Sequence, residues 1–356
     1  MSAMGGFQPH GGDLRRVVRE LSLAGEPLDF SVNTHPFGPP ESALAAATAA
    51  LSEIDRYPDP QAGALIDALA AAHGLPPRCL LAGNGATELI DLIPRALGLH
   101  RALQVTPTFS AYGEAVRRTG GRVIEVPRSS LAEFPTHAAC EAIRRGDPEL
   151  VTLCTPNNPT GDRIDDAALG AVLAACAQVG AYLLLDEAFV EYDPEGSRLG
   201  WLERHPRMMV LRGFTKFYAL AGLRVGYLAA APDVAGRLRA ARPPWSVNRV
   251  AEAAAIACLA DTEYPAREQA RMTALREDFS RDLSGLGLKP LPSVAGYLLV
   301  ELPDGASADR LFKALARDGF LIRHCGSFGL KENWLRLRVH RSEHNRAFVS
   351  ALSRHL

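Results

Sequence analysis

A lysine among aromatic residues, with an arginine eight positions further on, is the strongest chemical signal in the sequence. Lys216 follows Thr215 and precedes Phe217 and Tyr218, and Arg224 closes the segment. A lysine in partly desolvated surroundings loses its proton more easily and can form a Schiff base. The arginine and the threonine hydroxyl are suited to binding a phosphate dianion. Taken alone, the pair would be better explained as a surface lysine and an arginine in a salt bridge.

Two polar residues directly follow apolar runs that are typical of strands. Asp186 ends the run Tyr182 to Asp186, and Asn158 follows the run Leu150 to Cys154. Ligands of open α/β folds bind at the carboxyl edge of the parallel sheet. A buried carboxylate there would keep a pyridine nitrogen protonated, and Asn158 could donate to a ring hydroxyl. Taken alone, Asp186 could cap a helix, and the NNPTG sequence around Asn158 could be only a turn.

A glycine-rich turn joins another predicted strand to a predicted helix. It runs from Ala82 to Glu88 and reads Ala-Gly-Asn-Gly-Ala-Thr-Glu. The free N–H groups at the start of a helix point toward any anion that lies there. The spacing is not GxGxxG, so a dinucleotide site is not indicated.

Short apolar runs alternate with helical patterns along the middle of the chain. This alternation predicts an α/β fold with a mostly parallel central sheet, which would bring the residues named above together. The predicted strands of this sheet are Cys79 to Ala82, Ala102 to Thr106, Arg122 to Val126, Leu150 to Cys154, Tyr182 to Asp186, Met208 to Leu211 and Val225 to Ala230. The predicted helices are Ala86 to Leu97, Asp166 to Val179 and Ala251 to Ala260.

The chain is expected to form two domains, since 356 residues with 47% hydrophobic content can bury one large core and a smaller one. Residues 1–40 are predicted to be an arm that contributes to the small domain and the active site, residues 41–245 the large domain, and residues 246–356 a small α+β domain. The proline-containing stretch from Arg242 to Pro244 marks the expected boundary. In the small domain we expect a strand from Gly296 to Glu301, a helix from Ser307 to Arg317, two further strands and a closing helix from Ser342.

Composition excludes several other classes of protein. The 39 basic and 40 acidic side chains give a net charge of −1, which leaves no positive excess to hold a nucleic acid. No apolar run is long enough for a membrane helix or a signal peptide, so the protein is expected to be cytoplasmic. Six scattered cysteines form no CxxC pair, and neither a metal site nor a disulfide framework is predicted.

In this order along the chain, the motifs resemble those of the class I and II aminotransferases of fold type I, and the resemblance covers nearly the whole length. It implies pyridoxal 5′-phosphate as cofactor, with Lys216 carrying it and Asp186 pairing with its ring nitrogen. It implies a phosphate site made by Thr215, Arg224 and the Gly85-Ala86-Thr87 turn. These are the residues expected to do the chemistry.

The same resemblance implies three further contacts. Asn158 would contact the ring oxygen and Phe109 would stack on the ring. Tyr57, in Arg-Tyr-Pro-Asp, is similar to the tyrosine that reaches the phosphate from a neighbouring subunit, which implies a homodimer with shared active sites. Phe189 stands where many members have a tyrosine, so the usual network at the ring oxygen is in doubt.

Several motifs are similar to one branch of the family, the threonine-phosphate decarboxylases of cobalamin synthesis. They are His10-Gly11-Gly12, Phe30-Ser31-Val32-Asn33, the DEAF sequence that ends at Phe189, Thr215 to Tyr218, and Pro244-Trp245-Ser246-Val247-Asn248. Asp13 departs from the asparagine common in that branch. The resemblance implies decarboxylation of L-threonine O-3-phosphate to (R)-1-amino-2-propanol O-2-phosphate.

The small domain offers candidates for binding a phosphorylated amino-acid substrate. Arg323 and Arg336 are its predicted anion-binding residues, and His10, Ser31 and Asn33 are expected to close the pocket from the arm. Arg338 would share a face with Arg336, but a solvated surface position is the alternative favoured for it. Two other functions stay open: a histidinol-phosphate:2-oxoglutarate aminotransferase, and a noncatalytic protein that binds the same cofactor.

Overall fold

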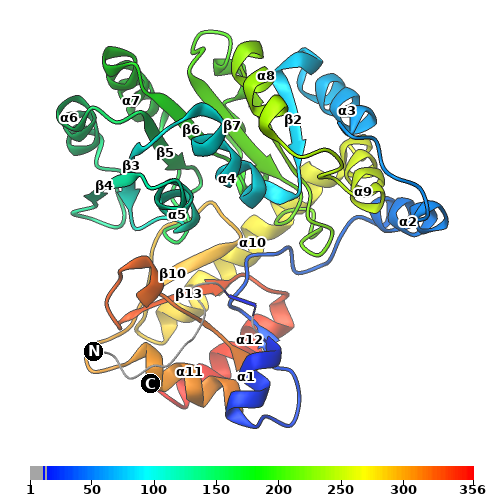
Figure 1. The fold of residues 1–356 in the computed structure, drawn as a ribbon. Coiled ribbons are helices and arrows are strands. Elements are labelled where there is room, and N and C mark those ends of the chain that lie inside the picture. The colour runs from blue at the N-terminus through cyan, green and yellow to red at the C-terminus, as the bar shows by residue number, and fades with distance from the viewer. Residues whose placement is uncertain (1–10, 13) are drawn as a thin grey trace.

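A seven-stranded sheet forms the centre of the larger part of the molecule (Figure 1). The computed structural model describes residues 11–12 and 14–356. The strand order is β2-β8-β7-β6-β5-β3-β4, and only β8 runs antiparallel to its neighbours. The strands are β2 Leu80–Gly83, β3 Arg101–Thr106, β4 Arg122–Pro127, β5 Leu150–Cys154, β6 Tyr182–Asp186, β7 Met208–Gly213 and β8 Gly226–Ala230. The predicted mostly parallel sheet is therefore confirmed.

Both faces of this sheet are covered by helices, which explains why its inner strands are apolar without alternation. On β6, Leu184 contributes to the core beneath α4, α5 and α8, whereas Leu183 and Leu185 contribute to the core on the opposite face with α6 and α7. The helices are α4 Gly85–Leu97, α5 Ala111–Arg118, α8 Pro232–Ala241, α6 Thr136–Gly146 and α7 Asp166–Val179. Asp186 continues the alternation, so its side chain lies on the face that α5 covers.

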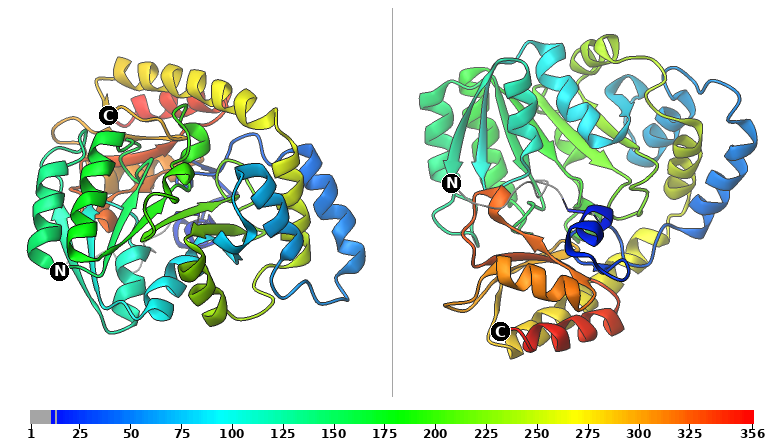
Figure 2. Two further views of the ribbon diagram at one scale, coloured as in Figure 1. Left: turned by 90° about the horizontal axis from the view of Figure 1, so that it is seen from above. Right: turned by 60° about the horizontal axis from the view of Figure 1, so that its bottom comes forward.

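Helices α2 (Glu41–Ala50) and α3 (Gly63–His73) both pack against α9 (Arg249–Ala260) at one end of the sheet (Figures 1 and 2). The long helix α10 (Tyr264–Gly285) then carries the chain to the smaller part, where it contacts β9, β10 and α12. The expected boundary after residue 245 thus precedes a helix that packs on the large part. The exact division into domains remains a prediction.

The smaller part is built on the antiparallel sheet β12-β13-β10-β9. A second, two-stranded sheet pairs β1 from the arm with β11 in parallel, so the described residues of the arm are joined to this part. The strands are β9 Lys289–Pro290, β10 Tyr297–Glu301, β12 Arg323–His324, β13 Trp334–Arg338, β1 Leu28–Asp29 and β11 Phe320–Leu321. The helices are α1 Leu14–Leu21, α11 Ala308–Arg317 and α12 Ser342–Ser353.

The elements predicted from the sequence are present, with ends displaced by at most two residues. Helix α9 begins at Arg249 because the Asn248 side chain accepts a hydrogen bond from the Ala251 N–H at 2.8 Å. Helix α10 was not predicted. Its buried face includes Glu268 and Arg276, which interrupt the apolar stripe that identifies an amphipathic helix. In the part of the chain that the structure describes, no helix is long and apolar enough to cross a membrane.

Phe30 anchors the arm in the core of the smaller part, and its removal should destabilise the protein. Its ring is fully buried and stacks on Phe348 with centroids 4.5 Å apart. We expect Phe30→Ala to lower the free energy of unfolding by about 3–5 kcal/mol, because truncation leaves a cavity. The half-exposed Leu356 provides a control, since Leu356→Ala should change the free energy of unfolding by less than about 0.5 kcal/mol. Urea titration followed by circular dichroism measures both; equal midpoints for the two variants would contradict the assignment.

Candidate active site

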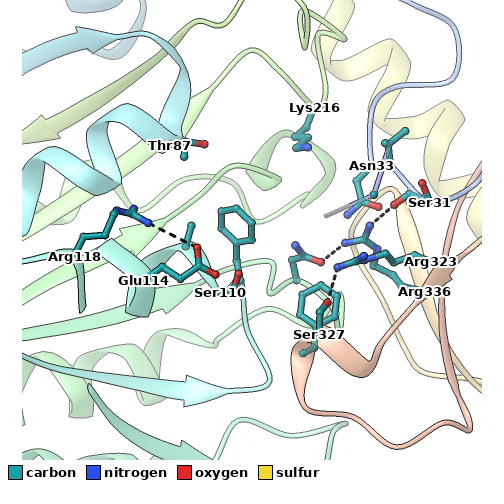
Figure 3. A pocket seen from close by; sticks show the side chains of 16 residues that line it. Ser31, Asn33, Thr87, Ser110, Glu114, Arg118, Lys216, Arg323, Ser327 and Arg336 are labelled. Atoms are coloured by element: carbon teal, nitrogen blue, oxygen red, sulfur yellow. Dashed lines mark hydrogen bonds and ion pairs between the residues drawn. The ribbon is translucent and has the colours of Figure 1, made fainter. Parts of the chain in front are cut away.

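A cavity of about 310 Å³ lies where the carboxyl ends of the parallel strands meet the smaller part of the molecule. The cavity is lined by Thr87 from the first turn of α4, which follows β2, and by Phe109, Asn158 and Lys216 from the loops after β3, β5 and β7. Across from them lie residues of the arm and the small sheet, including Ser31, Asn33, Arg323 and Arg336 (Figure 3). The sheet therefore supplies one wall of the pocket and the smaller part supplies the other.

Lys216 lies in the loop after β7 and reaches this cavity. Burial, the positive charges of Arg336 and Arg224, and a weaker opposing effect of Asp186 together lower the pKa of Lys216 to about 8. The backbone is held from the arm, since the His35 N–H donates to the Lys216 carbonyl at 2.8 Å. The lysine is thus partly neutral near physiological pH, as nucleophilic chemistry requires.

Asp186, the last residue of β6, is buried beside the loop that carries the lysine. The Tyr112 hydroxyl donates to its Oδ2 at 2.6 Å, and the Ala188 N–H donates to Oδ1 at 2.8 Å. Burial raises the pKa of Asp186, while these hydrogen bonds and Lys216 act against the increase. A carboxylate held in this way can form a strong ion pair with a protonated ring nitrogen.

The start of α4 is the predicted site for the cofactor phosphate. Gly85 has a φ of +75°, and a Cβ added there would lie 2.6 Å from Nη2 of Arg224. A side chain at this position would be strained and would displace the guanidinium, which lies against the first turn of the helix, where N–H groups are free. Arg224 itself has a φ of +61°, a strained conformation that is typical of functional sites. Thr87 lines the cavity from the same turn, whereas Thr215 is half-buried and does not line it.

Asn157 ties the loops that carry Asn158 and Phe109 together. The Thr108 hydroxyl donates to Asn157 Oδ1 at 2.9 Å, and Asn157 Nδ2 donates to the Pro107 carbonyl at 3.1 Å. Asn158 Oδ1 accepts a hydrogen bond from Nη1 of Arg336 at 2.5 Å, which fixes the orientation of its amide group.

Phe189, the departure from the family pattern, packs edge-on against Tyr297 with ring centroids 5.0 Å apart. Tyr297 is buried, and its hydroxyl donates to the Asn157 carbonyl at 2.7 Å. Phe189 therefore fills an apolar contact and offers no hydroxyl of its own, so Asn158 remains the predicted partner of the ring oxygen.

Arg323 and Arg336 occupy directly opposite positions on the antiparallel strands β12 and β13. Arg336 donates from Nη2 to the Ser31 carbonyl at 2.5 Å, and among the described residues it forms no ion pair with a carboxylate. Burial lowers the pKa of Arg336; burial, then repulsion from Arg336, lowers the pKa of Arg323 to about 10. A buried cation without a counterion is costly, so this arrangement favours an anionic ligand.

Other predicted residues lie elsewhere. Tyr57 is 80% exposed, packs against the Trp245 ring at a tilt, and does not line the cavity of its own chain. Its proposed contact with a neighbouring subunit remains a prediction. Arg338 is buried and donates to the Asp29 carbonyl at 3.4 Å, so the solvated position favoured for it is wrong. His10 and Asp13 lie outside the described residues.

Several residues that face the site were not predicted. Tyr112 could have been found, because it lies one helical turn beyond Phe109 at the start of a helix. Ser327 and Phe328 follow Arg323 in a short 3-10 turn, η5 (Gly326–Phe328), whose position depends on the tertiary fold. Gly11 and Val32 also line the pocket and belong to motifs of the arm that the sequence analysis had singled out. The remaining lining residues come from the start of α5 and its first turns, which were not predicted: Ser110, Ala111, Glu114 and Arg118.

The chain belongs to the aminotransferase class I and II family, whose model matches residues 26–352. It is 37% identical over 355 residues to the threonine-phosphate decarboxylase of Salmonella typhimurium, across 96% of this chain and 95% of that protein. It is 35% identical over 349 residues to histidinol-phosphate aminotransferase 2 of Ralstonia nicotianae, across 96% of this chain and 92% of that protein. The predicted family is confirmed.

Solved structures show the same fold. The histidinol-phosphate aminotransferase of Sinorhizobium meliloti, in complex with pyridoxal 5′-phosphate, has a TM-score of 0.87 and 26% identity, across 99% of this chain and 98% of that chain. The L-threonine-O-3-phosphate decarboxylase of Porphyromonas gingivalis has a TM-score of 0.82 and 26% identity, across 92% of this chain and 98% of that chain. The fold is that of the fold type I transferases, as the sequence predicted.

The lowered pKa of Lys216 should be visible in chemical labelling of the apoprotein. The chain has only four lysines, and Lys289, Lys313 and Lys331 are exposed and serve as internal controls. Because the neutral amine reacts, acetylation of Lys216 should reach half of its maximal rate near pH 8, well below the ordinary lysine value of about 10.4. Peptide mass spectrometry across a pH series measures the four rates separately.

Arg336→Gln removes a positive charge near Lys216. It should therefore raise the pH at which acetylation of Lys216 reaches half of its maximal rate. The exposed Arg317 on α11 gives a matched control, since Arg317→Gln should leave the midpoint unchanged. A Lys216 profile that coincides with those of the three exposed lysines would show that the pocket does not lower its pKa.

Proposed function

We propose that this chain is a pyridoxal-phosphate-dependent enzyme that decarboxylates L-threonine O-3-phosphate to (R)-1-amino-2-propanol O-2-phosphate. The observation that carries the proposal is Arg336, a buried cation without a carboxylate partner in the described chain, set opposite Arg323 at one end of the pocket. Two adjacent cations suit a substrate with two anionic groups. Threonine phosphate has both a carboxylate and a phosphate.

The residues at the other end of the pocket fit pyridoxal 5′-phosphate. Lys216 would carry it, Asp186 would pair with its ring nitrogen, and Phe109 would cover its ring. Arg224, lying against Gly85 at the start of α4, would hold its phosphate. The fit rests on the space left by the missing Cβ of Gly85 and on a buried carboxylate at a strand end. When bound, this cofactor withdraws electrons from the bond that breaks at the substrate Cα.

The protein's own part in the reaction is to orient and to move protons. Arg336 and Arg323 would hold the two anionic groups of the substrate, which determines the bond at Cα that is placed for cleavage. Asn158 is oriented by Arg336, so substrate binding and the cofactor wall are coupled through one hydrogen bond. Lys216, whose Nζ reaches the pocket and whose pKa is lowered, would be suited to carry a proton to the substrate Cα.

A second candidate is transamination of histidinol phosphate, favoured by the 35% identity with the Ralstonia nicotianae aminotransferase. Its amino donor has one anionic group and an imidazole ring, which makes a weaker match to two adjacent arginines. Glutamate, the second substrate of such a reaction, would nevertheless use both cations. We therefore keep this reaction as the alternative that the assay below must exclude.

We also propose a cytoplasmic homodimer with shared active sites. Five large exposed apolar side chains come from α2, the turn that follows it, the Tyr57 loop and the loop before α9: Leu44, Leu51, Ile54, Tyr57 and Trp245. Exposed apolar side chains from neighbouring elements are typical of subunit contacts. Arginine side chains brace the loops, since Arg242 donates to the Pro60 carbonyl and Arg249 to the Tyr57 carbonyl. Tyr57 is thus presented outward.

The reaction itself is tested with the purified holoenzyme and threonine phosphate. We expect one carbon dioxide for each threonine phosphate consumed, without any requirement for a 2-oxo acid. Headspace carbon dioxide and the phosphorylated amino alcohol are measured together. A 2-oxoglutarate-dependent reaction with histidinol phosphate, with no carbon dioxide from threonine phosphate, would contradict the proposal and establish the alternative.

Arg336→Gln should lower kcat/KM for threonine phosphate by about 30-fold or more. The reason is that truncating one partner of a buried charged contact costs about 2–5 kcal/mol. Arg317→Gln, on the exposed face of α11, should leave kcat/KM unchanged. Cofactor content of the two variants should match the wild type, and equal kcat/KM values would rule out Arg336 as the substrate's anion-binding residue.

A further inference from the structure

Phe328 contacts both of the arginines at the substrate end of the pocket. The guanidinium carbon of Arg323 lies 5.3 Å from the centre of its ring, and that of Arg336 lies 5.8 Å away. Such distances allow a cation–π attraction to each. Arg323 also donates from Nη2 to the Ser327 hydroxyl at 2.6 Å, so two consecutive residues of η5 hold it (Figure 3).

The turn that carries Phe328 is well defined by its own hydrogen bonds. The Phe328 N–H donates to the Cys325 carbonyl at 3.0 Å, and the Gly329 N–H donates to the Gly326 carbonyl at 2.9 Å. Gly329 has a φ of +77°, which a side chain would disfavour, and it turns the chain toward Leu330. The backbone of Phe328 is therefore held in place by the hydrogen bonds of this turn.

A second cavity of about 440 Å³ lies beyond this turn. It shares Ser110, Ser327 and Phe328 with the substrate pocket, so these three side chains form the partition between the two spaces. Farther in, its lining includes Gln104 and Arg128. Arg117 and Glu125 line it as well, so much of its wall is polar.

Arg323 and Arg336 lie so close together that the Phe328 ring can reduce the repulsion between them. Like charges on directly opposite strand positions repel each other, and here both are buried. A ring that attracts both guanidinium groups offsets part of that repulsion and keeps them turned toward the pocket. Of the three partition residues, only Phe328 has this contact, and it is also the largest.

We propose that Phe328 is a specificity-determining residue: its ring positions Arg323 and Arg336 for a compact phosphate ester and closes the substrate pocket against the adjoining cavity. This deepens the proposed function and rests on it only in assuming that the pocket binds a phosphate monoester. Compact substrates such as threonine phosphate are then favoured over phosphorylated amines with a large ring. Removal of the Phe328 ring joins the two spaces and relaxes that preference.

The test measures binding of two phosphate esters that lack an amine and cannot react, isopropyl phosphate and 2-phenylethyl phosphate. Calorimetry with the holoenzyme gives both Kd values. In Phe328→Ala we expect weaker binding of the isopropyl ester and a change in the ratio of the two Kd values of at least about tenfold in favour of the phenylethyl ester, a size that one pocket wall can supply. Phe328→Tyr keeps the ring and should retain the wild-type ratio.

Leu330→Ala is the matched control for the cavity alone, because Leu330 lines the adjoining space and not the substrate pocket. It should leave the ratio unchanged. An unchanged ratio in a Phe328→Ala protein with wild-type cofactor content would overturn the inference, whatever reaction the enzyme catalyses. If neither ester binds the wild type, the phosphate assignment of the pocket fails, and this inference fails with it. If the esters bind but threonine phosphate is not decarboxylated, the ratio of the two Kd values still tests the role of Phe328.

Discussion

The site depends on the positive charges gathered around Lys216. Burial is the main cause of its lowered pKa, and the charges of the buried Arg336 and the exposed Arg224 add to it. The fold accepts this repulsion because neutral acceptors hold the arginine: a carbonyl of the arm and the amide of Asn158 bind Arg336. An unliganded pocket of this kind stores unfavourable electrostatic energy, and anionic ligands release it. Affinity for anions and reactivity of the lysine thus have one cause.

The central sheet determines where these groups can meet. Its parallel strands bring the residues after β2, β3, β5, β6 and β7 to one edge, so motifs far apart in sequence become neighbours. Within that edge, the alternation of β6 turns Asp186 toward α5, where Tyr112 binds it. The antiparallel β8 follows the Arg224 turn and returns the chain beside β2, which places that arginine against the first turn of α4.

Sequence reasoning reached the parts of the site that are encoded locally. Strands buried on both faces are continuous apolar runs, so their ends, and with them Asp186, Asn158 and Lys216, could be predicted. Contacts between distant segments could not. Tyr112 and Asp186 are 74 residues apart, and Arg336 and Asn158 are 178 residues apart, so no local pattern reports either hydrogen bond. The same limit explains why the burial of Arg338 was not predicted: it depends on the arm, which packs over β13.

The two walls of the pocket come from different parts of the chain, and this division bears on how specificity can change. The sheet edge holds the groups suited to the cofactor, whereas the arm, β12, β13 and η5 hold those suited to the substrate. Substitutions in the second set can alter which substrate bond faces the reactive centre while Lys216 and Asp186 stay in place. Relatives named for decarboxylation and for transamination can therefore be about equally similar to this chain, at 37% and 35% identity. What separates the two reactions must be sought in the substrate wall, where Phe328 joins the two arginines to the boundary of the pocket.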